Sequence, residues 1–104
     1  MTKEQGESGT KVRVWQKPDL QVPKMYKVVL INDDYTSMDF VVSILETVFH
    51  KSPAEAVQIM LRVHNEGRGV CGLFPKQIAE TKISQVEKLA RKAGFPLRCA
   101  MEEE

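Results

Sequence analysis

The stretch KVVLINDDYTSMDFVV, residues Lys27–Val42, decides the fold, because a strand pattern changes to a helix pattern within it. Its first part, residues 28–31, is an apolar run rich in β-branched side chains, which favours a buried strand. Its second part begins an apolar stripe at three- and four-residue spacing, which is typical of a helix. The stripe consists of Met38, Val41, Val42, Leu45, Val48 and Phe49. We therefore expect a strand that leads directly into a helix.

The loop between these two patterns, NDDYT at residues 32–36, carries two carboxylates and one side-chain amide. Asn and Asp favour turns because their side chains hydrogen-bond to nearby backbone groups. Thr36 or Ser37 can cap the helix, and Asp39 follows Thr36 at the spacing of a capping box. A purely structural interpretation stays open, in which the loop turns the chain and complements the helix dipole. The loop nevertheless offers more polar side chains than capping needs.

Length and composition indicate one small domain. The chain has 104 residues, 42% of them hydrophobic, which is enough for one modest core. A formal net charge of +1 gives no reason to expect nucleic acid or an anionic membrane as a partner. We find no signal peptide and no apolar run long enough to cross a bilayer. Cys71 and Cys99 lack CxxC spacing, so we expect reduced thiols in a cytoplasmic protein, although one disulfide stays possible.

The first 23 residues differ in composition from the rest of the chain. Residues 1–23 are rich in Lys, Glu, Gln, Gly, Ser and Thr, which predicts a disordered N-terminal arm. Val12, Val14 and Trp15 form its only sizeable apolar cluster, and they either stay solvated or anchor a partner. Residues 24–104 are expected to form the core domain.

A capping signal marks the second helix of this core domain. Ser52 is a cap, Pro53 suits the first helical position, and Glu55 closes a capping box. Gly67 is the candidate for the residue that ends this helix. Similar signals predict a strand at 25–31, a helix at 37–50, the helix from 52 to 67, a strand at 69–74, a helix between Pro75 and Gly94, a strand at 95–101 and an acidic end at 102–104. This order predicts an α+β fold in which helices pack on a small sheet.

The polar residues Asn32, Asp33, Asp34 and His64 allow three chemical interpretations. A metal site needs converging ligands at regular spacing, which one His and two adjacent Asp do not provide. A small hydrolase would use Asp33 or Asp34 as general base with His64, but no Ser or Cys nucleophile is evidently paired with them. An ammonium-binding site fits better, since a carboxylate, an amide oxygen and a neutral imidazole are all hydrogen-bond acceptors.

Four apolar residues accompany this polar set, namely Met38, Val41, Met60 and Val63. Methionine is flexible, so it suits a pocket that must accept several side-chain shapes. Their periodicity is equally that of an ordinary helical core, and this alternative stays open.

Several motifs together resemble the ClpS family, adaptors that recognise N-degrons for an ATP-dependent protease. YKVVLINDDYTSMDFVV, AVQIMLRVHNEGRGVCGLFP, IAETK and FPLRC follow one another in family order over about residues 23–102. The resemblance implies a fold similar to the C-terminal domain of the bacterial ribosomal stalk protein, with three antiparallel strands and three helices. It also implies an adaptor that is not an enzyme and that uses no cofactor or metal.

The resemblance implies a pocket for the first residue of a substrate protein, where that residue is Leu, Phe, Tyr or Trp. Asn32, Asp33 and His64 match the residues that hold the α-amino group, so protonation of His64 below about pH 6.5 should weaken binding. Met38 matches a position that excludes β-branched residues. The positions around the side-chain pocket are Asp34, Thr36, Met38, Val41, Met60, Val63 and Leu97.

A second surface is implied for docking on the N-terminal domain of an AAA+ Clp unfoldase, ClpA in many bacteria. The matching positions are Tyr35, Glu80, Thr81 and Lys82. Without the resemblance, we would interpret them as ordinary solvent-exposed positions. Lys76-Gln77 stands where some members carry an acidic residue, which affects the expected docking strength. Ser37 stands where many members have Pro, and it still favours a helix start.

Two other classes of function remain as alternatives. A small hydrolase that uses Asp33 and His64 predicts turnover of a peptide. A ribosome-associated interaction module with the same fold predicts binding to ribosomal factors and indifference to the first residue of a peptide.

Overall fold

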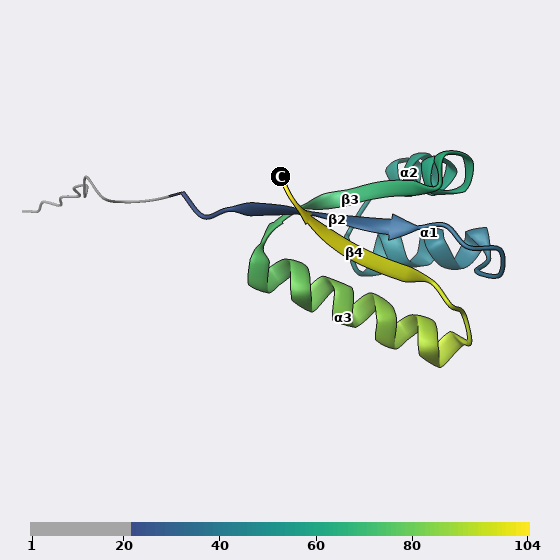
Figure 1. The fold of residues 1–104 in the computed structure, drawn as a ribbon. Coiled ribbons are helices and arrows are strands. Elements are labelled where there is room, and N and C mark those ends of the chain that lie inside the picture. The colour runs from purple at the N-terminus through teal and green to yellow at the C-terminus, as the bar shows by residue number, and fades with distance from the viewer. Residues whose placement is uncertain (1–21) are drawn as a thin grey trace, which may run out of the picture.

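The computed structural model of the protein describes residues 22–104, so Val12, Val14, Trp15 and most of the predicted arm lie outside the described residues. The described chain forms three strands and three helices (Figure 1). In chain order they are β2 Met25–Ile31, α1 Met38–Thr47, α2 Pro53–Glu66, β3 Arg68–Pro75, α3 Lys76–Ala93 and β4 Arg98–Glu103. This order confirms the predicted α+β fold.

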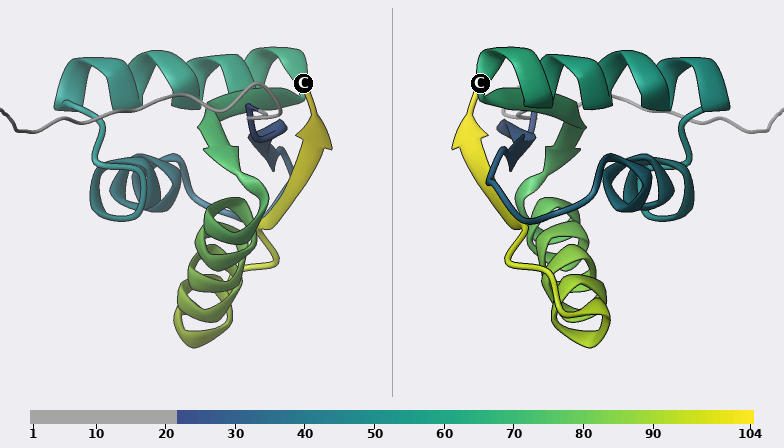
Figure 2. Two further views of the ribbon diagram at one scale, coloured as in Figure 1. Left: turned by 90° about the vertical axis from the view of Figure 1, so that its left-hand side faces the viewer. Right: turned by 90° about the vertical axis from the view of Figure 1, so that its right-hand side faces the viewer.

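The strands form one antiparallel sheet in the order β3-β2-β4. The strand that comes first in the described chain therefore lies in the middle, with Tyr26 opposite Phe74 of β3 and Glu103 of β4. The pairing with β3 shifts between Val28 and Val29, where β3 carries one extra residue. The two views of Figure 2 show β4 on the side of the sheet away from α1.

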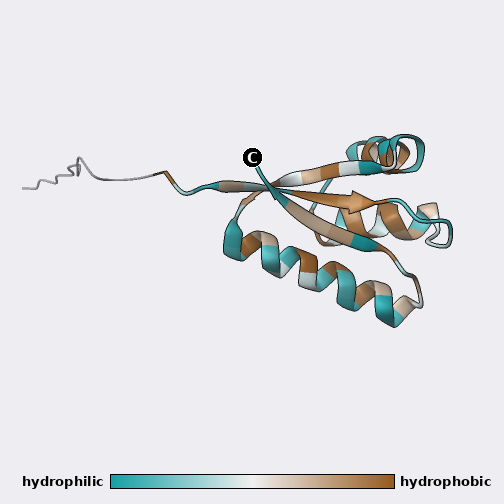
Figure 3. Ribbon diagram, viewed as in Figure 1, coloured by the Kyte–Doolittle hydropathy of each residue, from teal (hydrophilic) through white to brown (hydrophobic). Residues whose placement is uncertain are grey.

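The core lies between the sheet and the helices. Val28 and Leu30 of β2 are 0% exposed, and they pack in one cluster with Ile44 and Leu45 of α1 and Val86 of α3. Figure 3 shows β2 as hydrophobic towards its carboxyl end, whereas hydrophilic and hydrophobic residues alternate along α3. Burial of one such aliphatic side chain is worth about 1.5–3 kcal/mol. This cluster holds the elements that carry the candidate site in fixed positions.

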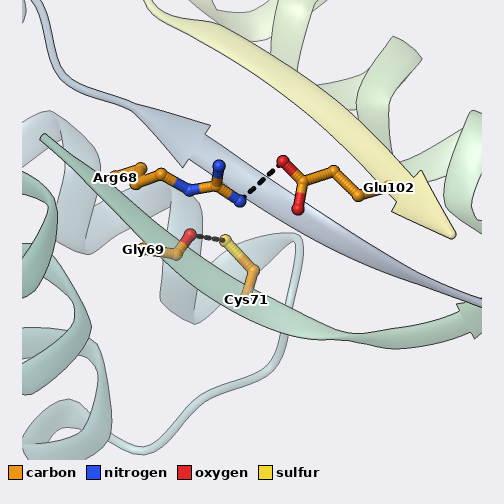
Figure 4. Close-up of polar contacts among 4 residues, drawn as sticks. All are labelled: Arg68, Gly69, Cys71 and Glu102. Carbon is orange, nitrogen blue, oxygen red and sulfur yellow. Dashed lines mark hydrogen bonds and ion pairs between the residues drawn. The ribbon is translucent and has the colours of Figure 1, made fainter. Parts of the chain in front are cut away.

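The other face of β2 is closed by side chains and not by a helix. Val29 is 1% exposed, and the alternation of a strand directs it away from Val28 and Leu30. Arg68 of β3 forms an ion pair of 2.7 Å with Glu102 of β4, and this pair spans β2 (Figure 4). The register places the ion pair on the face that carries Val29.

The second helix has the ends that the sequence predicts. The Ser52 hydroxyl accepts a hydrogen bond of 3.2 Å from the Glu55 amide, and the Glu55 carboxylate accepts one of 3.1 Å from the Ser52 amide. This reciprocal pair is the predicted capping box, with Pro53 as the first helical residue. Gly67 ends the helix with φ of 90°, a left-handed conformation that favours glycine.

The first helix begins at one of the two predicted cap residues but ends earlier than predicted. Ser37 is its cap and accepts a 3.1 Å hydrogen bond from the Phe40 amide, whereas the hydroxyl of Thr36 donates to Asp33. The helix ends at Thr47 and not at His50. His50 adopts φ of 55°, and the Lys51 amide then donates to the Leu45 carbonyl at 3.0 Å. No glycine marks this end, so the apolar periodicity alone placed it too late.

The last strand also differs from the prediction, since it covers Arg98–Glu103 and not residues 95–101. The Phe95 amide closes the end of α3 through a 2.9 Å bond to the Ala90 carbonyl, and its ring packs on Phe40 with centroids 4.9 Å apart. Pro96 has no amide hydrogen to donate to a strand. Glu102 and Glu103 of the predicted acidic end pair with β2 instead. Charged residues therefore extend this edge strand, which is common where an edge faces water.

Candidate ligand-binding site

The candidate site is a pocket of about 210 Å³ formed by the loop after β2, the start of α1 and the carboxyl-terminal half of α2. It brings together residues that lie up to a third of the chain apart. The lining residues are Asn32, Asp33, Asp34, Thr36, Met38, Val41, Met60, Val63 and His64. The structure thus assembles the predicted amine-binding residues and all but one of the predicted side-chain pocket residues.

A backbone hydrogen bond connects the loop to the end of α2. The Asn32 amide donates a 3.0 Å hydrogen bond to the carbonyl of Gly67, the left-handed residue that ends α2. This bond brings Asn32 close to the helical turn that carries His64. Both side chains are exposed at the pocket rim, where they can meet a ligand.

Asp33 organises the loop. Its Oδ1 accepts hydrogen bonds from the amides of Tyr35 at 2.8 Å and Thr36 at 2.7 Å, and its Oδ2 accepts one from the Thr36 hydroxyl at 2.7 Å. Partial burial raises the pKa of the Asp33 carboxyl, but these three hydrogen bonds together outweigh burial and place that pKa below its ordinary value. Asp33 is therefore a charged acceptor at neutral pH.

A charged Asp33 with a lowered pKa is a poor general base, because proton transfer is most efficient when the pKa of the base lies near the working pH. The described cysteines are not activated nucleophiles either. Burial raises the pKa of the Cys71 thiol well above its ordinary range and that of Cys99 to about 12. Protonated, buried thiols react slowly. Neither Asp33 nor the two cysteines thus supports the hydrolase interpretation.

The floor of the pocket is apolar and partly flexible. Val41 is 6% exposed and Val63 is 2% exposed, so both belong to the core and to the pocket wall at once. Met38 is 44% exposed and Met60 is half-buried, so these two have free surface towards the pocket. The interpretation of all four as ordinary core therefore holds for the valines only.

Leu97 is the one predicted pocket residue that the structure places elsewhere. It is 4% exposed and packs within the hydrophobic core, and it is not among the residues that line the pocket. Its contact with a ligand side chain stays a prediction.

The predicted docking residues do not all point to one surface. Glu80 and Thr81 are exposed on α3 beside a shallow hollow that also involves Gln77, Ser84 and Gln85. Tyr35 is 78% exposed, but it lies in the loop beside the pocket. Lys82 is half-buried and turns inward: its Nζ donates a 2.7 Å hydrogen bond to the Val48 carbonyl and lies 5.8 Å from the centroid of the Phe74 ring.

One residue that shapes the site was not predicted from the sequence. A Cβ atom on Gly69 would lie 2.8 Å from Cγ2 of Val63, so only glycine lets β3 approach α2 this closely. Val63 is a pocket wall, which makes Gly69 a support of the site. A glycine inside a strand often marks such a close approach, and that was the available signal.

Across residues 22–104, no helix is long and apolar enough to cross a membrane. Within the same residues, no three His, Cys, Asp or Glu side chains gather in a way that could hold a metal ion. The described site thus offers hydrogen-bond acceptors and apolar surface.

Comparisons with known proteins all identify the same protein family. The model of "ATP-dependent Clp protease adaptor protein ClpS" matches residues 21–100. The chain is 58% identical over 81 residues to the ATP-dependent Clp protease adapter protein ClpS of Wolinella succinogenes, covering 78% of this chain and 79% of the relative. It is 56% identical over 88 residues to the protein of the same name in Paraburkholderia xenovorans, covering 85% of each chain.

A solved structure shares the architecture. Agrobacterium tumefaciens ClpS2 bound to L-phenylalaninamide superposes with a TM-score of 0.77 at 41% identity, covering 80% of this chain and all of that chain. The family model, the relatives and this structure all point to the same fold and the same class of protein. The chain therefore belongs to the ClpS family of adaptor proteins of the ATP-dependent Clp protease.

Proposed function

We propose that this protein binds the free α-amino group and the large hydrophobic side chain of a substrate's first residue, and delivers that substrate to an AAA+ Clp unfoldase of the ClpA type. The observation that carries this proposal is the pocket itself. It joins an acceptor rim of Asn32, Asp33 and His64 to an apolar floor with Met38 and Met60. This combination suits a ligand that is cationic at one end and apolar at the other.

The rim accounts for selectivity towards a chain terminus. A free α-amino group has a pKa of about 7.7–8.0, so it is mostly an ammonium ion with three donors at neutral pH. An acetylated or internal nitrogen has no charge and fewer donors. Its binding would leave the acceptors of the rim desolvated without partners, at a cost of about 1–3 kcal/mol for each buried group. Asp33 contributes a full negative charge, because its lowered pKa keeps it ionised.

The floor accounts for the preference for a large apolar side chain. A volume of about 210 Å³ is small for a drug-sized molecule and suits one amino-acid side chain. Burial of a Leu or Phe side chain is worth about 1.5–3 kcal/mol. L-Phenylalaninamide, the ligand of Agrobacterium ClpS2, carries both a free α-amino group and a benzyl group. We extend this type of ligand to the present chain, with Leu, Phe, Tyr and Trp as the accepted first residues.

Delivery requires a second surface. We assign it to the exposed side of α3 around Glu80 and Thr81, with Tyr35 as a further contact. Lys82 contributes indirectly, because its bond to the Val48 carbonyl joins α3 to the end of α1. The expected partner is the N-terminal domain of the unfoldase.

Fluorescence anisotropy with four labelled peptides tests the binding step. The peptides begin with Phe, acetyl-Phe, Ile and Ala and are otherwise identical. We expect tight binding of the free Phe peptide alone. Acetylation removes the ammonium, the Ala side chain is too small to fill the pocket, and Met38 is expected to exclude the β-branched Ile side chain.

Equal binding of all four peptides, or of none, would refute the proposed pocket. Binding to ribosomal factors together with such indifference would favour the ribosome-associated alternative. Release of any cleaved product would favour the hydrolase alternative. Delivery is tested separately by degradation of a Phe-initiated reporter by unfoldase and protease, with and without this protein.

A further inference from the structure

The hydroxyl of Thr36 has a partner that its predicted role in the side-chain pocket does not require. It donates to Oδ2 of Asp33 at 2.7 Å, while the amides of Tyr35 and Thr36 both donate to Oδ1. A carboxylate oxygen accepts about two hydrogen bonds. Within residues 22–104, Oδ1 is thus fully occupied, and the one acceptor position left on this carboxylate belongs to Oδ2.

We propose that Thr36 is a positioning residue for Asp33: its hydroxyl holds Oδ2 in one orientation, so that the remaining acceptor position of that oxygen meets the ligand's ammonium group. This inference rests on the proposed amine pocket and deepens it. Thr36 itself lines the pocket, so its hydroxyl lies at the boundary between the acceptor rim and the apolar floor. The specificity for an ammonium group then depends on a residue that need not touch that group.

The orientation of an Asp carboxylate needs such support, because its terminal torsion is broad and roughly two-fold. The two amide donors hold only Oδ1, so without the hydroxyl the other oxygen loses its fixed partner. A third of the hydrogen bonds that the described protein makes to this carboxylate would be lost.

The pKa of the Asp33 carboxyl depends on the same donors. The titratable groups that line the pocket with it are Asp34 from the same loop and His64 from α2, while α1 contributes Met38 and Val41. No Lys or Arg is among the described residues that line the pocket, so hydrogen bonds and not a basic side chain lower the pKa of Asp33. The ammonium group of the ligand supplies a cation that the described lining residues do not.

Two substitutions separate the hydroxyl from the rest of the side chain. Thr36→Val keeps the shape and removes the donor, whereas Thr36→Ser keeps the donor and removes a methyl group. At pH 7 we expect Thr36→Val to weaken binding of the Phe peptide about tenfold, as for one lost hydrogen bond to a charged group. Thr36→Ser should bind within about twofold of wild type. Thermal unfolding confirms that each variant is folded, and Thr36→Ala serves as a second donorless variant if Thr36→Val unfolds.

Two further measurements exclude a merely structural role. A carbon-13 NMR titration of the unliganded protein should show a higher Asp33 pKa in Thr36→Val than in wild type, and the wild-type value in Thr36→Ser. In an Asp33→Asn background, Thr36→Val should weaken peptide binding no further, because there is then no carboxylate to position.

Three results would overturn the proposal: wild-type affinity in Thr36→Val, an unchanged Asp33 pKa, or an equal loss of affinity in the Asp33→Asn background. A wild-type protein that binds no Phe peptide is a different failure. It would refute the proposed function and the ligand contact of Oδ2, whereas the titration would still decide whether Thr36 orients Asp33.

Discussion

The loop at residues 32–37 and the exposed side of α3 both carry polar side chains, but only the loop has its polar groups organised before a ligand arrives. In the loop, the Asp33 carboxylate holds three hydrogen bonds within the protein. On α3, the hydroxyl of Thr81 donates to the Gln77 carbonyl of its own helix, and Glu80 is exposed to solvent. Preorganised groups give up less conformational entropy on binding. We therefore expect the loop to dominate affinity, and the α3 side to tolerate substitution.

Asp33→Ala is the strongest test of this contrast. It removes the one charged acceptor that the loop holds in place, and loss of one partner of a desolvated charge pair costs about 2–5 kcal/mol. Binding of the Phe peptide should weaken by at least about thirtyfold, measured by anisotropy.

The matched control is Glu80→Ala, which removes a carboxylate from the exposed side of α3. Peptide affinity should stay within about twofold of wild type, since exposed ion pairs contribute about 0–1 kcal/mol even to their own partners. Equal effects of the two substitutions on peptide binding would show that the preorganisation of the loop has no bearing on affinity.

Gly69→Ala tests whether the loop site also depends on close packing beneath it. The new Cβ would lie 2.8 Å from Cγ2 of Val63 and 3.2 Å from the Ile59 carbonyl oxygen. Since backbone cannot move aside easily, we expect a loss of about 1–3 kcal/mol in unfolding free energy, measured by urea denaturation. Peptide binding should weaken as well, because Val63 is a pocket wall.

Gly72→Ala provides the comparison for that substitution. Its Cβ would meet the far atoms of the Phe74 ring at 2.9 Å, and a half-buried ring can rotate away. The loss of stability should be smaller, and peptide binding should stay at the wild-type level. A Gly72→Ala variant that loses more affinity than Gly69→Ala would contradict the assigned support.

The elements that the sequence predicted correctly are those whose signals are local. Local signals act within a few residues, so the capping box of Ser52 and Glu55 and the left-handed Gly67 placed the ends of α2 correctly. The apolar run at 28–31 identified the buried strand for the same reason. The bounds of the last strand were wrong because they depend on distant contacts: this strand is defined by pairing with β2, and Phe95 is held by Phe40.

The features of the candidate site also fall into those with local signals and those that depend on distant contacts. The loop chemistry of Asp33 and the spacing of Met60 and His64 are local, and all three residues line one pocket. The contact of Gly69 with Val63 joins a strand to a helix, and the bond of Lys82 to Val48 joins residues 34 positions apart. Spacing within one element carries no information about such pairs. Gly69 gave only the general signal of a glycine inside a strand, which does not identify Val63 as its neighbour, and Lys82 gave no signal of its inward bond.

Lys82→Met tests the role of Lys82, the predicted docking residue on α3 whose side chain points inward. Methionine keeps an unbranched apolar stem but removes the donor to the Val48 carbonyl and the cation near the Phe74 ring. We expect a loss of about 1 kcal/mol in unfolding free energy, as for one net hydrogen bond, with peptide affinity unchanged. Urea denaturation and anisotropy measure the two effects separately.

Lys88→Met is the control, because Lys88 is exposed on the same helix. It should leave the unfolding free energy within about 0.5 kcal/mol of wild type. If Lys82→Met instead kept full stability and lost only unfoldase binding, Lys82 would be a direct docking residue and not a tether between α3 and α1.

His50→Gly is expected to have the smallest effect, and it tests why the three helix ends differ. Gly67 and Gly94 end α2 and α3 with φ of 90° and 82°, whereas the turn after α1 places His50 at φ of 55° without a glycine. A side chain in the left-handed region costs about 1 kcal/mol, and glycine offsets part of this gain through its freedom in the unfolded chain. We expect the unfolding free energy to rise by about 0.5 kcal/mol in urea denaturation, while Gly94→Ala should lower it. Destabilisation by His50→Gly would mean that the exposed His50 side chain makes a stabilising contact of its own, and that the end of α1 is not under backbone strain.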